Sequence, residues 1–286
     1  MSLLRLAPAL ALVVLMTGAA AQQVVEVPSP DRSGSQALML RGFWFAPPAG
    51  APAPALVLLH GCGGPYGAGG GLSERLRGMP ARLQAMGVGA LVLDSLSARG
   101  ERELCTQRMG TRAVTQLHRR RDALGALQWL AQQPGVDAAR LGLIGWSHGG
   151  STVLASTNRR HAEVAGAVLL PSLAVAYYPG CAADLARGYE AAAPLLMLVG
   201  EADDWTPAAP CKALAAAATG APVQIEAYAG AHHGFDSLVP LRLRTDVPNG
   251  AQPGRGVHVG GDPAAREASL ARLDAFLRER WGLAAP

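Results

Sequence analysis

The chain has 286 residues, of which 50% are hydrophobic, 16% are charged and 5% are aromatic, and its formal net charge is +4. This apolar content excludes an intrinsically disordered protein, and the length suits one α/β domain. The basic residues are scattered, apart from Arg119, Arg120 and Arg121. The sequence therefore lacks the continuous positive surface that nucleic acid binding needs, and we expect no nucleic acid partner.

A short apolar segment begins the chain. Arg5 precedes an apolar run at residues 10–16, and three alanines follow at residues 19–21. This order is typical of a secretory signal peptide that is cut after the alanines. The run is shorter than the ~20 residues of a membrane-spanning helix, and no later segment is apolar enough to span a bilayer. We therefore expect residues 1–21 to be removed and residues 22–286 to form a single domain, periplasmic or secreted, that does not bind membranes.

Short runs rich in Val, Leu and Ile predict buried strands. These runs are Ala55–His60, Gly89–Asp94, Arg140–Gly145, Ala165–Leu170, Pro194–Gly200 and Val223–Tyr228. Near-continuous apolarity is typical of strands that are covered on both faces. Residues 42–46 favour an additional antiparallel strand near the start of the domain.

Helical patterns separate these strands. They lie at residues 120–133, 150–157 and 208–219, and after the Asp262-Pro263 pair. Strands that alternate with helices predict the α/β class, with a mostly parallel, doubly wound sheet and helices on both faces. Two segments read as loops: the glycine-rich residues 61–71, and residues 236–262, which are unusually long for a connection and hence either functional or mobile.

A serine lies where nucleophilic catalysis would place it. Gly145-Trp146-Ser147-His148-Gly149 has the form G-x-S-x-G, directly after a predicted strand and before a predicted helix. In this context the serine is held on a sharp turn, and the flanking glycines let the strand and the helix approach closely. Ser147 is therefore the predicted nucleophile.

An acid and a histidine follow in the order that this architecture requires. Asp203 and Asp204 come after the predicted strand that ends at Gly200, and His232 and His233 come after the one that ends at Tyr228. Both pairs lie at the carboxyl ends of parallel strands, where ligands bind in such sheets. The order Ser, Asp, His is that of a catalytic triad. Adjacent residues in extended chain point in opposite directions, so only one histidine of the pair can face Ser147.

These motifs resemble those of the dienelactone hydrolase family of α/β-hydrolases. The resemblance rests on Trp146–Gly150, on the stretch from Gly200 to Pro207 and on Gly230–Phe235. The resemblance implies an α/β-hydrolase fold from about Pro47 to the last helix. It also assigns Asp203 as the acid and His233 as the base, although the choice between Asp203 and Asp204 stays open.

One departure from the family pattern concerns the substrate. The namesake enzymes use a cysteine nucleophile, whereas this chain has Ser147, which favours general esters over dienelactones. Arg99 is the nearest candidate for an arginine that would bind a substrate carboxylate, although an ordinary loop arginine is the simpler interpretation.

The same architecture predicts the oxyanion hole and the pocket. One amide donor is that of His148, after the nucleophile, and the other comes from the glycine-rich loop, where Cys62 is the expected donor. Tyr66, Trp146 and Trp205 lie near the catalytic loops and are expected to contact substrate, with core packing as the alternative for each. The reaction needs no metal or organic cofactor, and we expect none.

The four cysteines predict two disulfides, since an exported chain with an even count is usually oxidised. Cys62 and Cys105 follow strands that should be neighbours, as do Cys181 and Cys211. The expected pairs are therefore Cys62 with Cys105 and Cys181 with Cys211.

Together these features predict an exported serine carboxylesterase that acts on a small-molecule ester through an acyl-enzyme. A small serine peptidase with the same triad is one alternative, and a catalytically silent binding protein of the same fold is another. The sequence does not predict the acyl-chain length, the physiological substrate or the oligomeric state.

Overall fold

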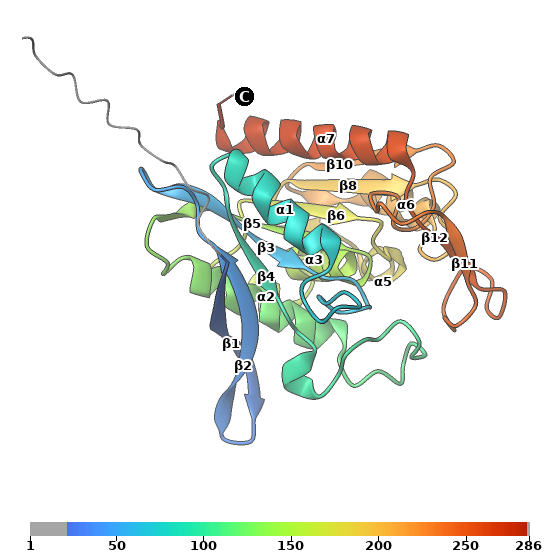
Figure 1. The fold of residues 1–286 in the computed structure, drawn as a ribbon, viewed down its shortest axis with the longest axis horizontal. Helices are drawn as coiled ribbons and strands as arrows, with labels where there is room; N and C mark the ends of the chain where they lie inside the picture. Colours follow the sequence, from blue (N-terminus) through green and yellow to red (C-terminus); the bar gives the residue numbers. More distant parts are fainter. Residues whose placement is uncertain (1–21, 285–286) are drawn as a thin grey trace, which may run out of the picture.

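The computed structural model describes residues 22–284, so the predicted signal peptide at residues 1–21 lies outside the described range. A sheet of eight strands crosses the molecule in the order β1-β2-β4-β3-β5-β6-β8-β10 (Figure 1). Its strands are β1 (Gln23–Ser33), β2 (Gln36–Phe45), β3 (Ala53–Leu59), β4 (Gly89–Leu93), β5 (Val136–Trp146), β6 (Leu173–Tyr177), β8 (Leu195–Gly200) and β10 (Val223–Tyr228).

The sheet is mostly parallel, as the sequence predicts. The strands from β4 to β10 pair in parallel, whereas β1 and β2 form an antiparallel pair at one edge. The central strands β3, β4 and β6 are buried along almost their whole length, which explains why their sequences show no alternation of apolar and polar residues. The predicted strand at 42–46 is the end of β2, and β1 was not predicted.

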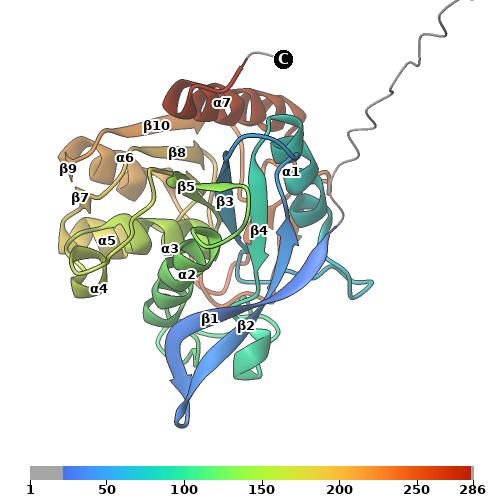
Figure 2. The ribbon, with the colours of Figure 1, turned by 90° about the vertical axis from the view of Figure 1, so that its left-hand side faces the viewer.

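Helices cover both faces of the sheet (Figure 2). Their bounds are α1 (Glu74–Ala85), α2 (Gln116–Leu130), α3 (His148–Thr157), α4 (Ala162–Ala165), α5 (Ala182–Arg187), α6 (Ala208–Ala217) and α7 (Pro263–Trp281), with a short 3-10 turn at Ser97–Arg99. The apolar residues of α1 and α7 pack on one face, and those of α2, α3 and α6 pack on the other. This arrangement confirms the predicted α/β class. None of the helices in the described part of the chain is long and apolar enough to cross a membrane.

The strand predicted at Ala165–Leu170 is wrong. Residue 165 ends the short helix α4, and the run that follows lies at the surface, where Val168 is 96% exposed. The sheet strand is instead β6, after Pro171, and every residue of β6 is buried. Both segments are apolar and short, so apolarity alone selected the wrong one.

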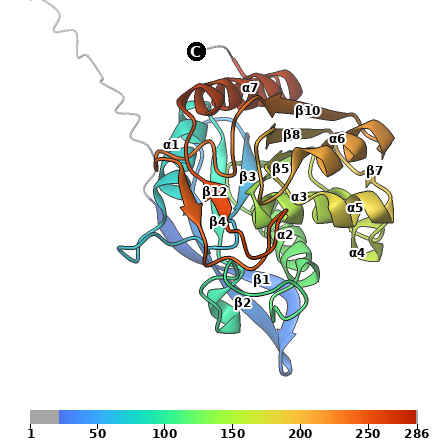
Figure 3. The ribbon, with the colours of Figure 1, turned by 90° about the vertical axis from the view of Figure 1, so that its right-hand side faces the viewer.

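The long segment at residues 236–262, which we call the strap, lies across the carboxyl edge of the sheet (Figure 3). It contains two short strands, β11 (Arg242–Arg244) and β12 (Val257–Val259), which pair with each other in antiparallel. A further small pair joins β7 (Glu190–Ala191) to β9 (Thr219–Gly220) away from this edge. The strap therefore has structure of its own and lies where the predicted site residues gather.

Candidate active site

Ser147 lies at the turn between β5 and α3 in a backbone conformation that is rare for a residue with a side chain. Its φ is 55° and its ψ is −118°. The neighbouring glycines are required by close approach: a Cβ at Gly145 would lie 2.2 Å from the Gly149 carbonyl oxygen, and a Cβ at Gly149 would lie 2.0 Å from the Leu59 carbonyl oxygen. The glycines of G-x-S-x-G thus allow the strained turn that presents the Ser147 hydroxyl at the sheet edge.

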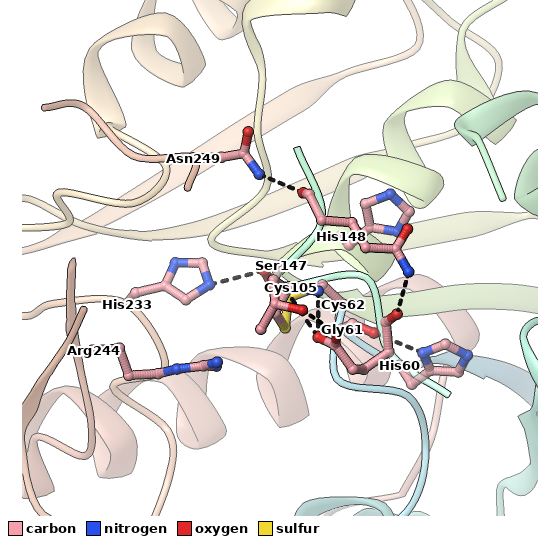
Figure 4. Close-up of a disulfide and its surroundings, with 12 residues drawn as sticks. His60, Gly61, Cys62, Cys105, Ser147, His148, His233, Arg244 and Asn249 are labelled. Carbon is pink, nitrogen blue, oxygen red and sulfur yellow. Dashed lines mark hydrogen bonds between the residues drawn. A yellow bond between two sulfur atoms is a disulfide. The ribbon is translucent and has the colours of Figure 1, made fainter. Parts of the chain in front are cut away.

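The structure brings Ser147, His233 and Asp203 together in one hydrogen-bonded chain. His233 Nε2 lies 2.8 Å from Ser147 Oγ (Figure 4), and His233 Nδ1 lies 2.8 Å from Asp203 Oδ2. Because a carboxylate only accepts, Nδ1 carries the proton and Nε2 is free to accept from the serine hydroxyl. A neutral imidazole held in this tautomer is the arrangement that general-base catalysis needs.

The Asp203 carboxylate is held by the chain that follows it. Its Oδ1 accepts hydrogen bonds from the backbone amides of Trp205 and Thr206, each at 2.8 Å, and its Oδ2 accepts from the Thr206 hydroxyl at 2.9 Å. Burial raises the pKa of Asp203, but the adjacent His233 and these hydrogen bonds outweigh it and hold the pKa below its ordinary value. Asp203 is therefore an ionised, fixed partner for His233.

Aromatic rings enclose the imidazole of His233, which is 3% exposed. The ring centroids of Tyr178 and Trp205 each lie 4.7 Å from that of His233. Tyr178 has a positive φ of 36°, and its hydroxyl donates to Asp236 in the strap at 2.7 Å. These contacts fix the ring plane of His233 and exclude water from its two sides.

Asp204 and His232, the chain neighbours of Asp203 and His233, both contact His258 in the strap. Asp204 accepts from the ring of His258 on β12 at 2.7 Å and from the His258 backbone amide at 2.8 Å. The ring of His232 lies against His258, with centroids 5.1 Å apart. His232 and Asp204 therefore face the strap, while His233 and Asp203 face Ser147.

The glycine-rich loop lies beside Ser147. A Cβ at Gly61 would lie 3.6 Å from the Ser147 Cβ, which places the loop in contact with the turn. Within residues 22–284, neither the Cys62 amide nor the His148 amide donates a hydrogen bond to another backbone group. Both donors are thus available to a ligand atom at Ser147.

Both predicted disulfides are confirmed. Cys62 is bonded to Cys105, and Cys181 is bonded to Cys211. Figure 4 shows the first disulfide beside Ser147, and the Leu104 amide additionally donates to the Cys62 carbonyl at 2.7 Å. The glycine-rich loop is therefore tied covalently to the loop after β4.

A pocket of about 240 Å³ opens over Ser147. Trp146 and Trp205 line it, as do Tyr178 and the strap residues Val239, Arg242, Arg244 and Val259. Trp146 is mostly a core residue, because its ring stacks on Tyr177 at 5.7 Å. Trp205 is the more open wall, and the guanidinium of Arg244 lies 5.6 Å from its ring centroid.

Tyr66 and Arg99, which the sequence suggested as substrate contacts, lie outside the pocket over Ser147. Tyr66 is not brought to this pocket: its hydroxyl donates to Asp94 at 2.8 Å and its ring packs edge-on against Phe43. Arg99 forms ion pairs with Asp31 and Asp122 and does not line the pocket. Neither side chain contacts Ser147, His233 or Asp203.

Sequence reasoning missed several residues of the site. Thr206 carried a usable signal, since a Ser or Thr three residues after an Asp often closes a local hydrogen-bonded turn. Tyr178 and the strap arginines carried none, because only the folded chain brings them to Ser147. In the described residues, no group of three or more His, Cys, Asp or Glu side chains is arranged to hold a metal ion.

Similar solved structures show that this chain has the α/β-hydrolase fold. The esterase Est2 from Thermogutta terrifontis, solved with propionate bound, is 18% identical with a TM-score of 0.62, covering 93% of this chain and 96% of that one. A dienelactone hydrolase-like promiscuous phosphotriesterase from metagenomic libraries is 20% identical with a TM-score of 0.62, covering 93% and 100%. A dienelactone hydrolase from Anabaena variabilis is 20% identical with a TM-score of 0.56, covering 76% and 89%.

Residues 40–279 match the model of the dienelactone hydrolase family. The match spans most of the chain, and the chain belongs to this family of hydrolases. A comparison with curated proteins finds none that matches.

Proposed function

We propose that this protein is a serine carboxylesterase that hydrolyses small esters through a Ser147-His233-Asp203 triad. The observation that carries the proposal is the hydrogen-bonded chain from the Ser147 hydroxyl through His233 to the buried Asp203 carboxylate. A serine hydroxyl becomes a nucleophile only when an oriented base accepts its proton. His233 is that base, and its hydrogen bond to Asp203 orients it.

The reaction proceeds in two halves. Ser147 Oγ attacks the ester carbonyl carbon while its proton moves to His233 Nε2, and the carbonyl oxygen becomes negative. The amides of Cys62 and His148 donate to that oxygen. The tetrahedral species then expels the alcohol, which takes the proton from His233, and water hydrolyses the acyl-serine by the same steps.

The pocket favours short acyl groups. Its volume of about 240 Å³ is below the ~300–1,000 Å³ of sites for drug-sized ligands. The Thermogutta terrifontis esterase, whose fold is similar, was solved with propionate, a short carboxylate. We therefore propose small-molecule esters with short acyl chains as the substrates.

We also propose that residues 1–21 direct export and that residues 22–286 form the working domain. Two disulfides support an oxidising compartment such as the periplasm or the exterior. The mass of the protein recovered from the periplasm would reveal a cut after Ala21.

A series of p-nitrophenyl esters from acetate to octanoate tests the esterase proposal. We expect wild type to hydrolyse the shorter esters best, and Ser147→Ala to lose activity by a factor of about 10⁶, as removal of a triad serine does elsewhere. Labelling of wild type by a fluorophosphonate separates the enzyme from a silent binding protein, because a silent site would not react. Hydrolysis of peptide substrates in preference to esters would favour the peptidase instead.

A further inference from the structure

Arg119 lies in the first turn of α2, behind the glycine-rich loop, and it is fully buried. Its Nη2 donates to the His60 carbonyl oxygen at 2.8 Å, and its Nη1 donates to His148 Nδ1 at 2.7 Å. His60 directly precedes Gly61 and Cys62, and Figure 4 shows His60 and His148 on the same side of Ser147. One guanidinium thus contacts both segments that carry the free amides.

The charge on Arg119 has no carboxylate partner. No Asp or Glu among residues 22–284 forms an ion pair with it. Asp122, one turn further along α2, is bonded to Arg99 and Ser29, and Asp122 and Asp94 attract the Arg119 charge only without direct contact. The Arg119 Nε, also buried, has no hydrogen-bond partner. Burial lowers the pKa of Arg119 to about 10, which still leaves it charged at neutral pH. A buried cation without a directly bonded carboxylate costs folding free energy, and the bonds of Arg119 to the His60 carbonyl and the His148 ring offset part of that cost.

The two histidines beside Arg119 are neutral. Burial and the charge of Arg119 lower the pKa of His60 to about 3 and hold the pKa of His148 well below its ordinary value. His148 Nδ1 accepts from Arg119, and His60 Nδ1 contacts the Gly61 carbonyl at 2.7 Å. Arg119 is therefore the positive charge beside these two neutral rings. It contacts His148 itself and the residue two positions before Cys62.

We propose that Arg119 is the positioning residue of the oxyanion hole. By its bonds to His60 and His148 it fixes the distance between the Cys62 amide and the His148 amide. Its buried charge also stabilises the negative oxygen of the tetrahedral species. This role rests on the proposed esterase function. It acts on the transition state more than on the bound ester, because the ester carbonyl carries no full charge.

Arg120 provides a matched control on the same helix. It is also buried, at 6% exposure, and its Nε also lacks a partner. Its Nη2, however, donates to Glu163 at 3.0 Å on α4, away from Ser147. Loss of Arg120 thus removes a buried guanidinium without touching the candidate oxyanion hole.

The test compares Arg119→Gln, Arg119→Lys and Arg120→Gln with wild type, each normalised to the sites that a fluorophosphonate titrates. We expect Arg119→Gln to lower kcat for p-nitrophenyl acetate on the order of 100-fold, as loss of an oxyanion donor does, with KM changed less than about threefold. Arg119→Lys keeps the charge and should retain more activity, and Arg120→Gln should keep kcat near the wild-type value.

A second readout separates positioning from general damage. Boronic acids form a tetrahedral, negatively charged adduct with a serine hydroxyl, so their affinity should fall in parallel with kcat in Arg119→Gln. Added guanidinium at millimolar concentration should restore activity to Arg119→Ala, because it refills the same buried position. This rescue and Arg119→Lys keep the test decisive if Arg119→Gln does not fold.

Three results would overturn the inference. Equal kcat per titrated site in Arg119→Gln and Arg120→Gln would remove any special role for Arg119. A rise in KM in Arg119→Gln, with unchanged affinity for the boronic acid, would mean that Arg119 shapes the pocket and not the oxyanion hole. Absence of ester hydrolysis in wild type would overturn the proposed function, and the inference with it.

Discussion

Asp203 and Asp204 are adjacent in the chain but hold different histidines. The carboxylate of Asp203 accepts from His233, whereas that of Asp204 accepts from His258 in the strap. The loop after β8 presents the two side chains in different directions, so one carboxylate faces Ser147 and the other faces β12. The sequence left this choice open because the two acids are adjacent after the same strand, although the family resemblance favoured Asp203.

Asparagine substitutions at these two positions should have unequal effects on ester hydrolysis. We expect Asp203→Asn to lower kcat by about 10⁴-fold, because the amide no longer fixes the productive tautomer of the histidine. Asp204→Asn removes only an anchor of the strap, and its kcat should fall less than about tenfold. Steady-state kinetics of both variants give the comparison, and equal losses would contradict the assignment of Asp203.

Asp203 should also make stability depend on pH. Its folded pKa lies below the ordinary value of 3.8, despite the opposing effect of burial. Such a carboxylate stabilises the folded state at pH values above its unfolded pKa, and this contribution is lost as the pH falls through the folded pKa.

Urea unfolding of wild type and Asp203→Asn from neutral pH into the acid range measures this contribution. We expect the difference in free energy of unfolding to be largest near neutral pH and to shrink as the pH falls below 3.8. A difference that stays constant across the range would show that the Asp203 pKa is not lowered by folding.

At the scale of elements, the turn between β5 and α3 depends on how closely the helix approaches the sheet. Gly149 in the first turn of α3 faces the carbonyl oxygens of Leu59 and His60 at the end of β3. A side chain at position 149 would push α3 away from β3 and would shift the glycine-rich loop that follows β3.

Gly149→Ala should therefore destabilise the protein and lower its activity. We expect a loss of roughly 1–3 kcal/mol in the free energy of unfolding, the usual cost of overpacking. Gly78→Ala is the matched control, because a Cβ at Gly78 in α1 meets nothing within 4 Å and an exposed helical alanine is favoured over glycine by about 1 kcal/mol. Thermal unfolding measures both variants, and equal stability would contradict the close approach.

Most sheet strands were predictable because they are buried on both faces and carry continuous apolar runs. The error at Ala165–Leu170 arose from the same rule, since that run is as apolar as β6 but ends a short helix and lies at the surface. Which of two apolar runs enters a sheet is decided by hydrogen-bond partners on neighbouring strands. Those partners belong to other parts of the chain, so the sequence of a single segment does not predict them.

The strap was predictable as a long connection but not as a wall of the site. Its anchors are pairs of residues far apart in the sequence, such as Asp204 with His258 and Arg75 with Asp236. The backbone of the strap also bonds directly to the site, because the Gly260 amide donates to the His233 carbonyl at 3.0 Å. No local pattern in residues 236–262 carries these contacts.

At the scale of the whole molecule, the site combines residues from widely separated parts of the chain. The order of Ser147, Asp203 and His233 was readable because each residue follows a strand in a motif of its own. The enclosing residues Tyr178 and Arg244, and Arg119 behind the loop, were not readable, since their roles depend on packing between helices, loops and the strap.

The two disulfides should differ in their effect on activity. Each should stabilise the protein by about 2–4 kcal/mol, but only Cys62–Cys105 pins the loop beside Ser147. We expect the double variant Cys62→Ser/Cys105→Ser to lose both stability and kcat, and Cys181→Ser/Cys211→Ser to lose stability alone. Melting temperatures and kcat at a temperature where both variants stay folded test this. Equal kcat in the two variants would contradict the role of the first disulfide.

Trapping the acyl group on the protein tests the proposed chemistry most directly. Wild type and Ser147→Ala are mixed with p-nitrophenyl acetate, quenched with acid within the first turnover, digested and mapped by mass spectrometry. We expect the acetyl group on the peptide that contains Ser147 in wild type, and no acylated peptide in Ser147→Ala. An acyl group on another residue, or ester hydrolysis that persists in Ser147→Ala, would contradict the serine esterase.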